Sequence, residues 1–237
     1  MQYPSCHPGC AKRACGEADR GGQGSIGLTK AGADNREDSR RLVRNGTWRV
    51  VVMSDSMVVQ LGKNLTLDDV RAVGSGARVV LAPEAEAGIR ASNQLVRDRI
   101  ERVGEPPVYG VNTGFGALAG ITIDRDKLKS LQLNLIRSHA CGVLEPLGLE
   151  VSRMVVLLRA QVLALGHSGA RISLVQALLD LLNAGVTPVI PSRGSVGASG
   201  DLAPLAHLAL VLIGEGEAYF EGERLPGADA LNRAQLK

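Results

Sequence analysis

From about residue 57 onward, apolar residues recur every three or four positions, which is the spacing of an amphipathic helix. Pro83 suits the first turn of one such helix, and Gly104 suits its end. Its apolar stripe consists of Ile89, Val96, Ile100 and Val103. A second stripe, in a helix expected from Asp124, consists of Leu128, Leu131 and Leu135. Further helices are expected after the N-terminal caps Thr66, Ser152 and Ser173, the last of them ending at Gly185, and over residues 202–213.

Other segments lack the helical period. Residues 108–120 are rich in glycine and predict a loop, while Pro188 and Pro191 favour an extended chain. Residues 217–220 and 223–225 predict a small hairpin. We therefore expect a mainly α fold with minor β-hairpins.

Residues 1–56 have a different composition, rich in Gly, Arg, Asp and Ser, and show no sustained period. This composition is typical of disorder, so we expect an atypical extension over 1–56 and a folded domain over 57–237. The extension holds three cysteines and a histidine, which are residue types that bind zinc. Because the spacing of Cys6, Cys10, Cys15 and His7 forms no paired CxxC pattern, we expect no metal site.

Composition narrows the class of protein. The chain has 237 residues and a net charge of +3, which is too small to favour nucleic acid or membrane as a partner. No apolar run reaches the ~18 residues of a transmembrane helix. Residues 1–30 also lack the apolar region of a signal peptide. We expect a cytoplasmic protein that binds neither nucleic acid nor membrane.

The most informative chemistry lies in the glycine-rich segment 194–201, which contains Ala198-Ser199-Gly200. Gly200 has no Cβ, so its amide nitrogen can approach the Ala198 carbonyl closely. Ring closure and loss of the Ser199 hydroxyl would remove two waters and leave an electrophilic ring with an exocyclic methylene. The simpler interpretation is a turn that leads into a helix, with Asp201 as the N-cap of that helix.

Three segments, 109–116, 134–142 and 189–207, resemble motifs of the aromatic amino-acid ammonia-lyases, and the resemblance extends from about Val58 to Lys237. It implies the N-terminal part of the helical ammonia-lyase (fumarase/aspartase-like) fold. In that family, Ala-Ser-Gly becomes 4-methylidene-imidazol-5-one (MIO), a self-derived cofactor that here would form from Ala198, Ser199 and Gly200. No metal or diffusible coenzyme is implied. The pair Ser138-His139 resembles the histidine-specific branch.

The resemblance also implies roles for single residues. Tyr109 would act as a catalytic base or acid, His139 would contact the substrate, and Asp201 would assist proton transfer during cyclisation. The structural alternatives are a tyrosine that packs its own loop, a buried helix histidine and a helix cap. We interpret His207 as structural, His167 as a loop residue and Cys141 as a small buried hydrophobe.

One residue departs from the family pattern. Leu144 stands where the family usually has a glycine. If that position requires a positive φ, a leucine there strains the backbone.

The activity implied by the resemblance is non-oxidative removal of ammonia from L-histidine to give trans-urocanate, in a homotetramer with shared active sites. Family members are about twice as long as this chain, so one alternative is an inactive fragment. A second alternative is an MIO lyase or aminomutase for tyrosine or phenylalanine.

Two unrelated interpretations are weaker. Residues 114–119 fit the loose G-x-G-x-x-A dinucleotide pattern but lack the strand–helix alternation around it. Ser199 lacks the following glycine of a hydrolase nucleophile elbow, because Asp201 occupies that position.

Overall fold

The computed structural model describes residues 57–102, 106, 108–116, 119–121, 123, 127–195 and 202–236. Contacts divide the chain into Met1–Gly46 and Thr47–Lys237, and all described residues belong to the second unit. The extension expected over 1–56, with its three cysteines, lies outside the described residues. In the described part, no helix is both long and apolar enough to cross a membrane.

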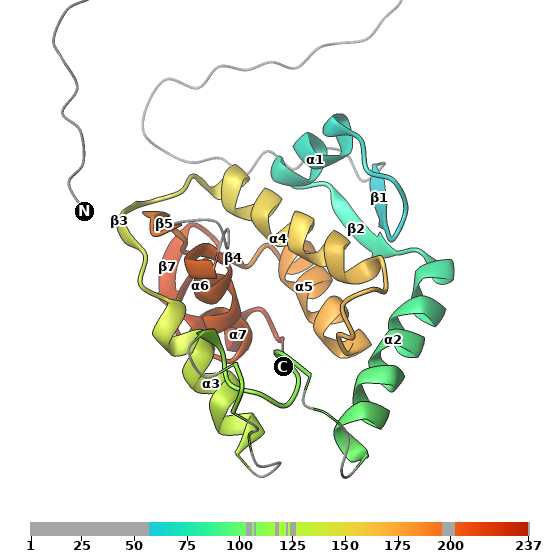
Figure 1. Cartoon of the computed structure of the whole chain (residues 1–237). Helices are drawn as coiled ribbons and strands as arrows, with labels where there is room; N and C mark the ends of the chain where they lie inside the picture. Colours follow the sequence, from blue (N-terminus) through green and yellow to red (C-terminus); the bar gives the residue numbers. More distant parts are fainter. Residues whose placement is uncertain are drawn as a thin grey trace, which may run out of the picture. The chain divides into compact units, whose positions relative to one another are not determined.

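The fold is mainly α, as predicted (Figure 1). In chain order its elements are β1 (Val58–Leu61), α1 (Leu67–Gly74), β2 (Arg78–Leu81), α2 (Pro83–Glu101), α3 (Leu128–His139), β3 (Val143–Pro146), α4 (Leu149–Ala164), α5 (Ile172–Ala184), β4 (Thr187–Pro188), β5 (Pro191–Arg193), α6 (Leu202–Leu212), β6 (Glu217–Phe220), β7 (Glu223–Pro226) and α7 (Gly227–Arg233).

The strands form three small sheets. β1 and β2 pair in parallel, β3 and β5 pair antiparallel, and β4 adds to the predicted β6–β7 hairpin. The parallel β1–β2 pair and strand β3 were not predicted from the sequence. Four-residue apolar strands give too short a pattern to distinguish from other apolar segments.

The main core lies where α4 and α5 pack together and against β1, β2 and α1 (Figure 1). Its fully buried members include Leu61, Val79, Leu157 and Leu178. A second cluster, made of Leu181, Val186, Val211, Ala218 and Ala230, joins α5 to α6, β6 and α7. This second cluster fixes helix α6, whose first residue follows directly after segment 196–201.

A buried arginine ties three helices together. Arg153 on α4 donates from Nε to the Val73 carbonyl at 2.9 Å and from a terminal nitrogen to the Leu182 carbonyl at 3.1 Å. These carbonyls lie in the last turns of α1 and α5, where the helix dipole favours a positive charge. Burial lowers the pKa of the guanidinium. The carbonyl groups at the ends of α1 and α5 therefore stabilise the buried charge of Arg153, as a carboxylate would in an ion pair.

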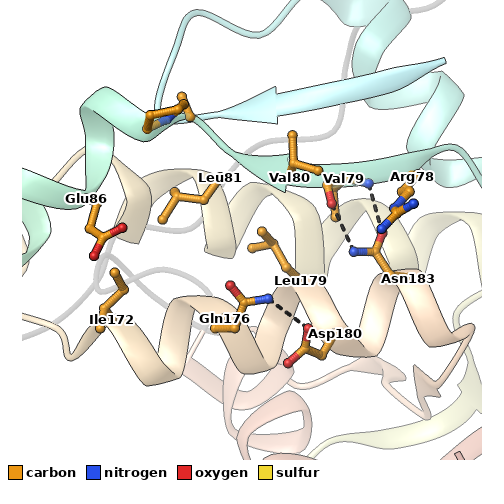
Figure 2. Close-up of a pocket in the computed structure, with 12 residues that line it drawn as sticks. Arg78, Val79, Val80, Leu81, Glu86, Ile172, Gln176, Leu179, Asp180 and Asn183 are labelled. Carbon is orange, nitrogen blue, oxygen red and sulfur yellow. Dashed lines mark hydrogen bonds between the residues drawn. The ribbon is translucent and has the colours of Figure 1, made fainter.

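Amide side chains complete the backbone hydrogen bonding of the short strands. Asn183 on α5 accepts from the Val79 amide and donates to the Val79 carbonyl, both at 2.9 Å (Figure 2). Gln161 does the same for the turn after β1, accepting from Gly62 and donating to Lys63. These hydrogen bonds join residues about a hundred positions apart in sequence. At Val79 they also satisfy the backbone amide and carbonyl on the unpaired edge of β2.

Helix starts show where local signals succeed and fail. Thr66 caps α1 in a full capping box with Asp69, as the sequence indicated. The predicted caps Ser152 and Ser173 are wrong: the cap of α4 is Gly148, four residues earlier, and the cap of α5 is Arg171, two residues earlier. The face of α4 that contains Ser152 packs against the core, so Ser152 is buried. This packing extends the helix N-terminally beyond the predicted cap.

Candidate active site

His139 is the last residue of α3, and its ring is held by its own helix. Nδ1 lies 2.8 Å from the Leu135 carbonyl oxygen and 3.1 Å from the Ser138 hydroxyl. A carbonyl can only accept, so we assign the proton of the neutral ring to Nδ1. Nε2 then carries a lone pair. The ring is half-buried, which leaves the imidazole able to accept a hydrogen bond from a substrate.

The chain after His139 is tied to helix α6. The Gly142 amide donates to His207 Nε2 at 3.0 Å, across 65 positions of sequence. His207 lies on α6, in the second turn after Leu202. A second link joins α3 to the turn after α6, since Arg137 forms a two-point ion pair with Glu215 at 2.5 and 3.0 Å. This pair raises the pKa of Arg137 and lowers that of Glu215.

The chain that enters segment 196–201 is packed on the same glycine. Strand β5 pairs Arg193 with Val143, and Gly194 follows with φ +152°. A Cβ on Gly194 would lie 2.9 Å from the Gly142 Cα, which real Cβ atoms do not tolerate. Gly194 is therefore glycine because the two backbones touch. Both ends of segment 196–201, at Gly194 and on α6, converge on Gly142, three residues after His139.

The predicted electrophile residues Ala198, Ser199 and Gly200, and the predicted cap Asp201, lie outside the described residues. The structure therefore places their flanks and does not test the residues themselves.

Tyr109 lies in a loop, as predicted, and its side chain is 62% exposed. Its ring packs edge-on against Phe115 at a centroid distance of 5.8 Å. Asn112 holds this loop by accepting from the Val108 amide at 2.7 Å and through the bond from the Ile123 amide to its carbonyl. Among the described residues, the hydrogen bonds of 108–116 stay within residues 108–123, so the structure does not join Tyr109 to His139.

Three further expectations have clear outcomes. His167 lies in the turn between α4 and α5 and is exposed, as predicted. The interpretation of Cys141 as a buried hydrophobe is wrong, because α3 ends at His139 and leaves the thiol exposed in the following turn. Leu144 has φ +68°, so the backbone keeps the conformation that favours glycine and the leucine bears the strain.

A pocket of the described residues lies elsewhere. A cavity of about 380 Å³ opens between β2 and α5, and none of the predicted site residues lines it (Figure 2). Several of its polar side chains already have partners: Asn183 binds Val79, Gln176 binds Asp180, and Glu86 pairs with Arg90. Within the described residues, no cluster of three or more histidine, cysteine, aspartate or glutamate side chains could hold a metal.

Sequence reasoning missed the role of Gly142. The only available signal was a glycine close after the motif Ser138-His139, in a position where any side chain would be expected to fit. A Cβ there would lie 2.9 Å from His207 Nε2 and 3.0 Å from the Pro191 Cβ. These contacts arise from residues 49 and 65 positions away, which no local pattern reveals.

Comparisons with known proteins agree with this arrangement. The family model described as aromatic amino acid lyase matches residues 65–237. A histidine ammonia-lyase from Myxococcus xanthus is 53% identical over 186 residues, which cover 78% of this chain and 36% of the relative.

Solved structures give the same result. Histidine ammonia-lyase from Trypanosoma cruzi aligns with a TM-score of 0.68 and 41% identity, covering 76% of this chain and 35% of that one. Tyrosine aminomutase from Streptomyces globisporus aligns with a TM-score of 0.70 and 36% identity, covering 76% and 34%. The chain thus spans about a third of the length of these relatives.

Proposed function

Because the chain belongs to the aromatic amino acid lyase family, we propose that it is the electrophile-bearing part of a histidine ammonia-lyase. The proposed reaction converts L-histidine to trans-urocanate and ammonia without a metal or a diffusible coenzyme. One observation carries the proposal: both flanks of the segment with Ala198-Ser199-Gly200 converge on Gly142, three residues after His139. The chain just after the proposed substrate partner is thereby tied to both described flanks of the segment proposed to react, which supports the proposal.

The flanks fit a self-derived MIO group. Cyclisation requires a compressed loop, and compression costs conformational energy that surrounding packing must offset. The close contacts of Gly194 and the docked helix α6, which flank the segment, support this requirement. When formed, the group supplies an electrophilic methylene, an electron sink that ordinary side chains lack. The first amides of α6 follow this segment directly, and a helix N-terminus favours negative charge that develops nearby.

The remaining roles fall to side chains of this chain. His139 would accept a hydrogen bond at Nε2 from the substrate, and so orient it. Tyr109 would take or give the proton at the β-carbon, and its exposed loop would have to close over the site to do so. Asp201 would assist the proton transfers of cyclisation. A substrate with an imidazole ring fits a neutral histidine partner, whereas the ring of phenylalanine has no group that donates to it.

The alternatives differ in what supports them. Tyrosine aminomutase shares the fold at 36% identity, below the 53% of the Myxococcus histidine ammonia-lyase. The alternative of an inactive part is favoured by α4, whose outer face carries an apolar stripe that nothing covers in the described residues. The exposed members of this stripe are Val151, Leu158, Val162 and Leu165, at 47–49% exposure. We propose that further helices must cover this face before the site becomes active.

A chimera tests the activity. Residues 57–237 replace the matching segment of the Myxococcus relative, and urocanate absorbance is recorded with L-histidine. We expect turnover, and an intact mass two waters below the encoded mass. Ser199→Ala should abolish both, because the dehydration loses its leaving group, while the control Ser192→Ala should keep both. Tyrosine or phenylalanine as the better substrate would contradict the histidine assignment, and the encoded mass in an active chimera would contradict MIO.

The 237-residue chain by itself tests the need for further helices. We expect negligible urocanate formation and little or no loss of two waters. Robust turnover by this chain would show that its described part is self-sufficient. The proposal also includes a homotetramer in the cytoplasm; light scattering of the active chimera should give four copies, and a smaller active species would contradict that part.

A further inference from the structure

His207 is a titratable side chain that the proposed reaction leaves without a role. It lies on α6, which is otherwise entirely apolar in sequence, and its Nε2 accepts the Gly142 amide at 3.0 Å. An imidazole that accepts at Nε2 must be neutral, with its proton on Nδ1. Burial favours this neutral form by lowering the pKa of the ring, and no charged side chain contributes to that shift.

The atoms around this hydrogen bond leave no room for a side chain at Gly142 or Gly194. A side chain on Gly142 would collide with the imidazole and with Pro191 of β5. A side chain on Gly194 would collide with the Gly142 backbone and with the Ala203 Cβ at 3.1 Å. Three parts of the chain therefore meet at one point. They are the end of β5 with Gly194, helix α6, and the turn after His139. The hydrogen bond from Gly142 to His207 is a directional contact between the chain after His139 and α6, whereas the contacts at the Gly142 and Gly194 Cβ positions restrict shape alone.

Resting on the proposed function, we propose that His207 is a positioning residue: its Nε2 holds the chain just after His139 against α6, the helix that directly follows the segment with Ala198-Ser199-Gly200. The bond does not touch the substrate. It sets where the end of α3 lies relative to the start of α6, and a shift of either would move the substrate partner away from the reacting group. Misplacement by about 1 Å can lower a rate by roughly a hundredfold.

This proposal differs from a role in overall stability. A hydrophobic residue in place of His207 would fill the space but leave the Gly142 amide without its acceptor. A glutamine would restore an acceptor, because its Oε1 lies about as far from the backbone as Nε2 of histidine. The pair His207→Leu and His207→Gln therefore separates the hydrogen bond from the volume. His167→Leu, a change of an exposed histidine between α4 and α5, is the matched control.

The first test uses the 237-residue chain and amide hydrogen exchange. In His207→Leu we expect at least tenfold faster exchange at Gly142 and, beyond it, at Ala140 and Ser195. Exchange in the core helices α4 and α5 should not change. His207→Gln and His167→Leu should match the parent chain. Exchange that changes everywhere, only at Gly142, or nowhere in His207→Leu would overturn the proposal.

The second test uses the urocanate assay of the chimera. His207→Leu should lower kcat at least tenfold at constant helical circular dichroism, and His207→Gln should stay within about threefold. Equal losses in both variants, or none in His207→Leu, would overturn the proposal. If the chimera makes no urocanate even without these changes, the proposed function fails, whereas the exchange result still decides whether His207 positions the two segments.

Discussion

Replacing Leu144 tests whether the irregularity in β3 stores backbone strain. Between the pairs Val143–Arg193 and Pro146–Pro191, β3 advances three residues while β5 advances two, so β3 contains a bulge. Leu144 occupies this bulge with φ +68° and an exposure of 72%. Its side chain contributes little burial, so substitution there mainly reports on the backbone.

The magnitude follows from two opposing effects. A residue with a Cβ costs roughly 1–2 kcal/mol in the left-handed region, whereas glycine costs about 0.5–1 kcal/mol of additional chain entropy. Leu144→Gly should therefore be more stable than Leu144→Ala by about 0.5–1 kcal/mol. At Val143, which has no positive φ, the order should reverse by a similar amount. The reversal isolates the backbone, because both members of each pair lack the large side chain.

The measurement is urea unfolding of the 237-residue chain, followed by helical circular dichroism, for all four variants. Equal stability of Leu144→Gly and Leu144→Ala would refute the account of strain. The same order at both positions would refute it too, because a general preference for glycine or alanine would then explain the data.

Three further predictions concern single side chains. Arg153→Met should lower the free energy of unfolding by about 1–3 kcal/mol, since the Val73 and Leu182 carbonyls each lose one of two donors and keep only a backbone amide; the control Arg159→Met, on the exposed face of α4, should change it by less than about 0.5 kcal/mol. His207 should make stability fall as the pH drops below its ordinary pKa of about 6.5, because burial lowers its pKa and the unfolded chain takes up the proton first; His207→Gln should show a shallower decline between pH 7.5 and 5.5, and equal slopes would contradict this. His139→Leu in the chimera should lower kcat/KM for histidine roughly tenfold or more, and unchanged kinetics would make this residue structural.

Signals confined to a few neighbouring residues predicted the structure well. The N-cap at Thr66, the end of α5 at Gly185 and the β6–β7 hairpin all form as expected. Each depends on contacts within one turn of chain. The start of α4 could not be predicted in this way, because Ser152 is an acceptable cap locally but is buried by packing.

The pattern of apolar and polar residues could not predict which distant residues pair with each other. Val58 pairs with Arg78 in parallel only if the turn and helix between them bring the chain back alongside β1 in the same direction. The edge of β2 is closed by Asn183, whose amide matches a backbone partner only after α5 has docked. An asparagine near a helix end predicts a cap or a turn, so its sequence context indicated the wrong use.

The candidate site shows the same division. Motifs that resemble those of the family pointed to His139 and the Ala198-Ser199-Gly200 segment, and both stay predictions. The motifs could not select Gly142, which has no chemistry of its own. Its contribution is the absence of a side chain, and this matters only because two other segments occupy the space.

This arrangement has a mechanical consequence for segment 196–201. A loop held at one end can pivot, and a pivot would let Gly200 drift from the Ala198 carbonyl. A loop held at both ends on the same point has fixed end positions, so its remaining freedom is internal and the close approach is more often populated. Gly194 provides the first anchor through backbone contact, and His207 provides the second through a hydrogen bond. We therefore expect the glycines at 142 and 194 to matter for the proposed chemistry, because a Cβ on either would push apart the backbones at which the two anchors meet.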